Sequence, residues 1–257
     1  MLFAFATFAV RGDTLDFSNT NYIAINDSPD PPTVATPYPS AITVSGLTGE
    51  VITNLTVTLN GFSHSFPSDV NIILVGPQGQ MALLMSNVGG QEADPVTGLT
   101  ITLDDQAAAE LPLLDPLYSG TFRPTASSTP LLFNFPPPAP PGNSNALPML
   151  SVFNGTDPDG VWSLYVVDDV FENDGYISDG WSMSVSAGIP LQLNNSGANV
   201  VLSWPAVLGH SYSVQYSPSL TNLTWTNLPA VPSEVAGHYV VTNAKPGKAG
   251  VFRLLIQ

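Results

Sequence analysis

The sequence predicts an all-β protein with two successive β-sandwiches. Many short segments alternate apolar and polar residues, and 21 glycines and 25 prolines interrupt the chain at short intervals. Alternation with a period of two is typical of strands with one buried face, and frequent turns are typical of sandwiches. The only run that favours a helix, residues 106–110, is long enough for a turn or two.

The clearest strand signals lie before residue 188. Residues 51–59 alternate, so Val51, Leu55, Val57 and Leu59 are expected to share one buried face. Three further strands are expected at residues 70–75, 162–166 and 181–185. The run at 70–75 ends at Gly-Pro-Gln-Gly, which is a turn signal.

A proline-rich segment interrupts this rhythm at residues 124–148. It contains eight prolines, five of them within residues 136–141. Proline fixes the backbone and lacks an N–H group, so this stretch must be extended and cannot join a central strand. We expect a surface loop or an edge cover, or else a segment on which a partner docks.

Charge changes sign near residue 188, which suggests a domain boundary. Residues 1–188 carry 19 Asp and Glu against two Arg, whereas residues 189–257 carry Glu234 against three basic residues. The second domain, 189–257, repeats short strand signals and fits a small fibronectin-like sandwich. Its strands are expected at 200–204, 212–216, 223–225, 238–241 and 251–256.

The composition excludes several kinds of function. The net charge is −15 and only 10% of residues are charged, so the chain lacks the basic clusters that neutralise nucleic-acid phosphates. The absence of cysteine excludes disulfides and thiolate metal sites. A polar surface built from Ser, Thr, Asn and Asp is common in secreted bacterial β-proteins, so we expect a secreted or cell-surface location.

The first 13 residues leave two interpretations open. Residues 1–10 (MLFAFATFAV) are apolar, but they are too short to span a bilayer and no basic residue precedes them. They are either the remnant of a signal peptide or a β-strand that fills a sheet edge. No other segment resembles a membrane span.

The histidines offer little catalytic chemistry. His64 stands between Ser63 and Ser65, but neighbouring residues of a strand point to opposite faces, so neither serine easily meets it. We expect His64 to be packed or hydrogen-bonded, and His210 and His238 to lie on the surface. No nucleophile motif is present, so the chain is not expected to be an enzyme.

Acidic residues in loops indicate calcium, which prefers carboxylate and carbonyl oxygens. Asp168 and Asp169 end a strand, Asp174 and Asp179 follow within a short loop, and Asp27 lies in another loop. These five are the predicted calcium ligands, although Asp and Asp-Gly are also ordinary turn residues. Weaker candidates are Asp30, Asp69, Asp104, Asp105, Asp157 and Asp159.

Several segments together resemble a known family. Residues 153–164 (FNGTDPDGVWSL) and 174–182 (DGYISDGWS) are the most distinctive. The other segments that carry the resemblance are 37–40, 42–47, 59–70, 74–79, 120–124 and 167–169. Over roughly residues 14–187 the order and spacing resemble the P domain (P/Homo B domain) of proprotein convertases and bacterial subtilisin-like proteases.

The resemblance implies a jelly-roll-like antiparallel β-sandwich that is not itself a catalyst, and such domains often bind calcium. One interpretation is a secreted protein for adhesion or assembly, including a filament in which the N-terminal strand inserts into the sheet of another copy. The alternative is the C-terminal accessory region of a secreted protease or other hydrolase. The partners expected are therefore proteins or further copies of this chain.

Overall fold

The computed structural model describes residues 4–6, 9–90, 94–128, 131, 134–207, 211–219, 224–244 and 250–256. These residues form an all-β protein: the regular elements are strands and three short 3₁₀ turns, with no α-helix among them. The all-β prediction is therefore confirmed. Residues 106–110, the run that favours a helix, form turns and a single β-bridge instead.

The chain divides into two compact units. The larger unit comprises residues 14–46 and 54–185, and the smaller unit comprises residues 1–13, 47–53 and 186–257. The predicted boundary after residue 188 lies close to the division after Val185. The sequence did not indicate that residues 47–53 group with the chain termini.

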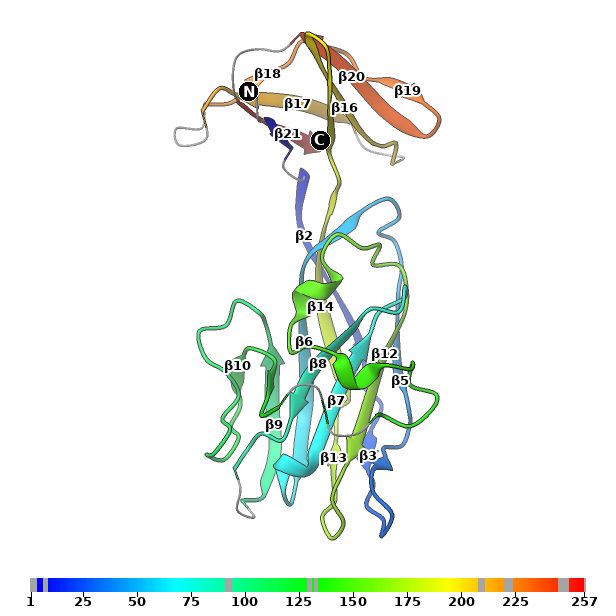
Figure 1. The fold of residues 1–257 in the computed structure, drawn as a ribbon, viewed down its shortest axis with the longest axis vertical. Helices are drawn as coiled ribbons and strands as arrows, with labels where there is room; N and C mark the ends of the chain where they lie inside the picture. Colours follow the sequence, from blue (N-terminus) through cyan, green and yellow to red (C-terminus); the bar gives the residue numbers. More distant parts are fainter. Residues whose placement is uncertain are drawn as a thin grey trace. The chain divides into compact units, whose positions relative to one another are not determined.

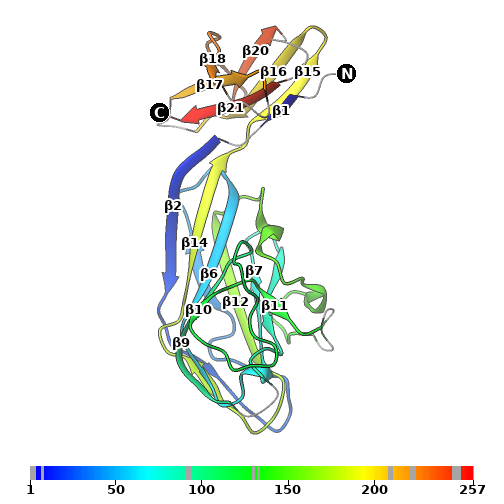
Figure 2. The ribbon, with the colours of Figure 1, turned by 90° about the vertical axis from the view of Figure 1, so that its left-hand side faces the viewer.

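Two β-sheets form the larger unit (Figures 1 and 2). One has the order β10-β9-β6-β13-β3, with β14 paired to β6 and to β2. Its strands are β2 (Ala9–Asn19), β3 (Ile23–Ile25), β6 (Val51–His64), β9 (Val96–Leu103), β10 (Gly120–Phe122), β13 (Gly175–Ile177) and β14 (Trp181–Ile189).

The other sheet has the order β11-β8-β7-β12-β4, with β5 also paired to β12. Its strands are β4 (Thr33–Val34), β5 (Ser40–Val44), β7 (Val70–Val75), β8 (Met81–Ser86), β11 (Thr125–Ala126) and β12 (Gly160–Asp168). The two sheets meet through buried apolar side chains, and Trp181 of β14 donates a hydrogen bond from Nε1 to Oγ of Ser40 in β5 at 3.1 Å.

Both sheets are mixed rather than purely antiparallel, which corrects one part of the expectation. β10 pairs with β9 in parallel, and β11 pairs with β8 in parallel. A long connection precedes each of these short strands, and the strand then runs in the same direction as its neighbour. Such returns leave no sign in the local alternation pattern from which the strands were predicted.

The alternation of β6 changes its phase where the strand passes from one unit to the other. Ile52 is buried while Val51 is only partly buried, whereas Leu55, Val57 and Leu59 are buried as predicted. Val51 and Ile52 belong to the smaller unit, and the residues from 54 onward belong to the larger one. The prediction for Val51 was wrong, because the buried face of β6 changes between Ile52 and Leu55.

The proline-rich segment covers the outer face of the sheet that contains β7 and β12. Tyr38 and Tyr165 donate hydrogen bonds from their hydroxyls to the carbonyls of Pro136 and Pro138, at 2.9 and 3.3 Å. This cover creates a second small core, formed by Ile73, Val75, Leu83, Leu131, Phe135, Ala139, Ala146, Tyr165 and Val167. The segment therefore covers a sheet face as well as the edge at β8, where β11 and Leu147 pair, and the covered face explains why β7 is buried along its whole length.

Two further sheets form the smaller unit, with the orders β1-β21-β17-β18 and β15-β16-β20-β19. Residues of both sheets share one buried cluster around Trp204. The strands are β1 (Ala4–Ala6), β15 (Gln192–Ser196), β16 (Asn199–Pro205), β17 (Tyr212–Ser217), β18 (Thr226–Asn227), β19 (Ser233–Val235), β20 (His238–Ala244) and β21 (Gly250–Ile256). The predicted strand at 223–225 is not found: Leu223 lies outside the described residues, and the strand begins at Thr226.

The N-terminal strand β1 lies at an edge of its sheet. It pairs in parallel with β21 of the same chain, with Ala4 opposite Gly250, Phe5 opposite Val251 and Ala6 opposite Phe252. The chain continues into β2, which pairs with β14. Residues 1–3, 7 and 8 lie outside the described residues.

The turn before β14 allows a direct test of the packing. Gly180 and Gly155 both have positive φ, at 65° and 79°, but a Cβ on Gly180 would lie 2.0 Å from the carbonyl oxygen of Asn19, whereas Gly155 is open. We expect Gly180→Ala to lower the free energy of unfolding by about 3 kcal/mol and Gly155→Ala by about 1 kcal/mol. Urea denaturation measures both, and equal effects would contradict the close approach of β2.

Candidate functional site

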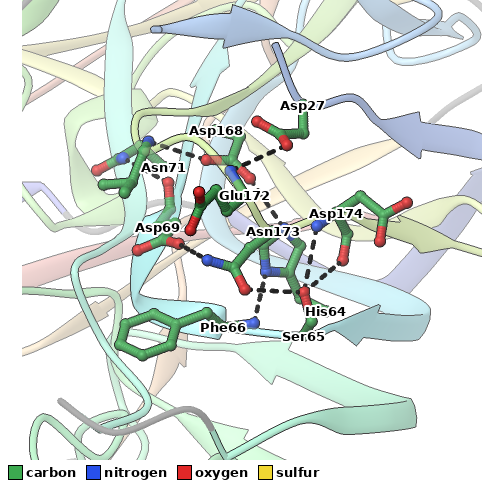
Figure 3. Close-up of polar contacts among 11 residues, drawn as sticks. Asp27, His64, Ser65, Phe66, Asp69, Asn71, Asp168, Glu172, Asn173 and Asp174 are labelled. Carbon is green, nitrogen blue, oxygen red and sulfur yellow. Dashed lines mark hydrogen bonds and ion pairs between the residues drawn. The ribbon is translucent and has the colours of Figure 1, made fainter. Parts of the chain in front are cut away.

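A buried polar cluster lies at one end of the larger unit, where strands of both sheets end or begin (Figure 3). β6 ends at His64, a 3₁₀ turn spans Pro67–Asp69, and β12 ends at Asp168. β7 follows the turn directly, and its first residue, Val70, lies opposite Asp168 in the antiparallel pairing of β7 with β12. The alternation of each strand turns its terminal residue, His64 or Asp168, toward the space between the sheets.

His64 joins the two sheets through Asp168. Its Nε2 lies 3.1 Å from Oδ2 of Asp168, and both side chains are almost fully buried. The backbone N–H of Phe66 donates to Nδ1 of His64 at 3.1 Å. Because Nδ1 accepts a hydrogen bond, we infer that Nε2 carries the ring proton and donates it to Asp168. The expectation that His64 is hydrogen-bonded is confirmed.

The serines beside His64 have other partners. Ser63 Oγ accepts from the backbone N–H of Gly98 at 2.8 Å, and Ser65 Oγ donates to Oδ1 of Asn173 at 3.2 Å. Both ring nitrogens of His64 already have partners, Asp168 and the N–H of Phe66. Neither serine therefore makes the serine–histidine hydrogen bond that activates a nucleophile. His238 is exposed, as predicted, and His210 lies outside the described residues.

Asp69 and Asp169 bring two more carboxyl groups to the cluster. The pKa of Asp69 is raised to about 7, chiefly by burial and next by the nearby charge of Asp168, with Asp169 adding to the rise and His64 and Asn173 opposing it. Burial likewise raises the pKa of Asp169 to about 6, with Asp168 adding to the rise while Asn71 and Asn87 oppose it. Oδ1 of Asp169 is buried and has no hydrogen-bond partner.

Amide side chains hold the acids in place. Asn173 donates from Nδ2 to Oδ2 of Asp69 at 3.1 Å, and Asn71 donates from Nδ2 to the backbone carbonyl of Asp69 at 3.3 Å. Ser86 donates in turn to Oδ1 of Asn71. The backbone N–H of Asp169 also donates to the carbonyl of Asp69 at 2.9 Å. The cluster is therefore a connected network that fixes the loop after β12 against the turn before β7.

The structure brings together only part of the predicted calcium set. Asp168 and Asp169 lie in the cluster, and Asp27 accepts a hydrogen bond from the backbone N–H of Glu172 in the same loop at 3.0 Å. Oδ1 of Asp27 is buried without a hydrogen-bond partner. Asp174 is exposed. Asp179 is also exposed and accepts from Ser178 at 2.7 Å, in the turn before β14.

Other acidic candidates have local structural roles. Asp157 accepts from the N–H of Asp159, as in an ordinary Asx turn, and Asp105 accepts from the N–H groups of Leu150 and Ser151 at the start of a 3₁₀ turn. Within the described ranges, no three or more His, Asp or Glu side chains are grouped closely enough to hold a metal ion. Calcium thus remains a prediction, centred on the cluster.

Asn71 and Asn173 were not among the predicted site residues, and Asp69 was only a weaker candidate. Each stands within a few residues of the end of a buried strand, as Asp168 does. To find them, one would need to know which strand ends lie side by side. Local sequence does not specify this, because β7 and β12 are about ninety residues apart in the chain.

Comparison with protein-family models, with curated proteins and with solved structures gave no significant match. The resemblance to the P domain therefore rests on the sequence segments given above. Among the described residues, no helix is long and apolar enough to cross a membrane.

The raised pKa values predict that stability falls as pH rises. Between the unfolded pKa of Asp, about 4, and the folded pKa of Asp69, about 7, only the folded protein holds the proton, so protonation stabilises the fold at low pH. We expect the free energy of unfolding to be about 2 kcal/mol lower at pH 8 than at pH 5 in chelator-treated buffer.

Asp69→Asn should remove most of this pH dependence, because the amide cannot titrate. His64, Asp168 and Asp169 face the same group, and the raised pKa of Asp169 leaves a smaller dependence. Asp179→Asn, at an exposed position, is the matched control and should keep the wild-type profile. Denaturation at a series of pH values measures the effect, and an unchanged profile in Asp69→Asn would show that another group titrates.

Proposed function

We propose that the protein is a non-catalytic, secreted or cell-surface β-sandwich protein that serves adhesion or structural assembly. In this proposal the larger unit is a P-domain-like, jelly-roll-like module and the smaller unit is a fibronectin-like module. The observation that carries the proposal is the pairing of β1 with β21. An edge strand of three residues, joined in parallel to its sheet, is the element that one copy can lend to another.

Exchange of β1 between copies joins them head to tail. Each chain supplies one strand and one receiving edge, so the contact does not close on itself and copies add without limit. The receiving strand, β21, is held on its other side by six residue pairs with β17. The edge therefore remains ordered when β1 leaves, ready for the β1 of a neighbour. A filament of copies is the expected assembly.

Cysteine cross-linking tests strand exchange directly, because the chain has no cysteine of its own. Phe5 lies opposite Val251 in the register of β1 and β21. We mix the single variants Phe5→Cys and Val251→Cys, oxidise them, and expect a disulfide-linked dimer on a non-reducing gel. Mass spectrometry distinguishes the heterodimer from the two homodimers, and an excess of heterodimer requires that β1 of one copy pairs with β21 of the other.

Val241→Cys is the matched control for Val251→Cys. Both valines are buried in the smaller unit, but Val241 lies on β20 in the other sheet. Mixing Phe5→Cys with Val241→Cys should give no heterodimer. Electron microscopy of the wild type should show filaments. Monomers together with no cross-link would reject assembly and favour an accessory region of a secreted hydrolase.

We further propose that calcium stabilises the larger unit at the buried cluster. Two carboxyl groups with raised pKa values, Asp69 and Asp169, lie close together. A bound cation would offset both the repulsion between their negative charges and the free-energy cost of burying those charges. Asn side chains and backbone carbonyls are the remaining oxygen donors that Ca²⁺ accepts.

Thermal unfolding with calcium and with chelator tests the cation. We expect calcium to raise the melting temperature of the wild type by several degrees, since a ligand that binds only the folded state stabilises it. Asp169→Asn should lose this response, whereas Asp179→Asn should keep it. A wild-type melting temperature that ignores calcium would contradict the proposal and leave the cluster as a hydrogen-bonded structural network.

A further inference from the structure

Two stacked tyrosines stand on the outer face of the larger unit. Tyr22 directly precedes β3 and Tyr176 lies in β13, and their ring centroids are 5.5 Å apart with an interplanar angle of 23°. Ile23, Ile25 and Ile177 alternate with them and are buried, so the two rings point away from the core. Tyr22 is 53% exposed, which is a large aromatic surface to leave in water.

Two hollows adjoin this aromatic pair. One, of about 310 Å³, is lined by both tyrosines together with Ser63, His64, Ser65, Thr97 and Asp174. The other, of about 540 Å³, is lined by Tyr22 together with Asn26, Asp27, Glu172 and Asn173. Tyr22, Asp174 and Gly175 belong to both. The hollows are therefore adjacent, and each has the size of a small-ligand pocket.

The lining combines flat aromatic faces with hydroxyl, amide and carboxylate groups. Oδ1 of Asp27 is buried without a hydrogen-bond partner, so one acceptor beside the second hollow is unused. The acids at the site are Asp27, Glu172 and Asp174, and neither hollow is lined by a lysine or an arginine of the described chain. An anionic ligand is disfavoured by this charge.

We propose that this surface binds an oligosaccharide that carries no negative charge. A sugar ring presents C–H groups on one face and hydroxyl donors at its edge, which match the exposed ring of Tyr22 and the acceptors around it. Because both hollows are lined by Tyr22, one sugar unit stacks on Tyr22 and its neighbours occupy the hollows. This inference names a ligand class for the proposed adhesion role and rests on that part of the proposed function alone.

Titration calorimetry of the full chain with chitotetraose, cellotetraose and tetragalacturonate tests the site. We expect binding of at least one of the two uncharged tetrasaccharides and none of the anionic one. Tyr22→Ala and Tyr176→Ala should each weaken binding at least about tenfold. Tyr118→Ala is the matched control, because Tyr118 is 57% exposed and packs on Phe122 away from the hollows, and it should bind like the wild type.

Three outcomes would overturn the inference: no binding of either uncharged sugar, preference for the anionic sugar, or unchanged affinity in both Tyr22→Ala and Tyr176→Ala. Circular dichroism of each variant shows that it is folded. Chromatography of the sugar after incubation separates this proposal from the preceding one. If the sugar stays intact and binding depends on the tyrosines, both the sugar-binding surface and the non-catalytic function are supported. If the sugar is cleaved, the binding surface still stands but the non-catalytic function is rejected.

Discussion

The structure of the larger unit depends on covering β7 and β12 on both faces. Both strands are apolar along most of their length, and the described chain has no helix to place over them. One face packs on the sheet that contains β6 and β14, and the proline-rich segment covers the other. The proline-dense part of this segment is suited to the role, because its extended backbone presents side chains such as Phe135 without offering a strand edge.

This double cover also explains the buried polar cluster. Because β12 is buried to its last residue, Asp168 ends the strand inside the protein instead of in water. A buried carboxylate must be hydrogen-bonded, and His64, at the end of β6 in the facing sheet, supplies the donor. Asp69 and Asp169 are then drawn into the same poorly solvated region, which is why the pKa of each is raised.

The sequence was sufficient for what depends on local pattern. Val57, Trp162 and Trp181 lie in strands that the alternation predicted, and all three are buried. The sequence was insufficient where distant segments decide the outcome. The parallel edge strands β10 and β11 and the meeting of His64 with Asp168 depend on pairings across long stretches of chain. The loop acids were recognised, but Asp174 and Asp179 could not be separated from Asp168 without knowing which strand ends meet.

Strand alternation also connects the inner cluster to the outer face. On β6, His64 bonds to Asp168 and also lines the first hollow together with its neighbour Ser63, and on β13 Tyr176 lies directly opposite Ser63. Ser65 links the buried acids to the hollows. Its hydroxyl donates to Asn173, which in turn donates to Asp69. The same hydroxyl accepts from the N–H of Asp174, which lines both hollows. The loop that fixes the buried acids is thus the loop that shapes the outer surface. A cation or proton that steadies Asp69 and Asp169 would steady the position of Asp174, so the two sites are coupled through a few hydrogen bonds within one loop.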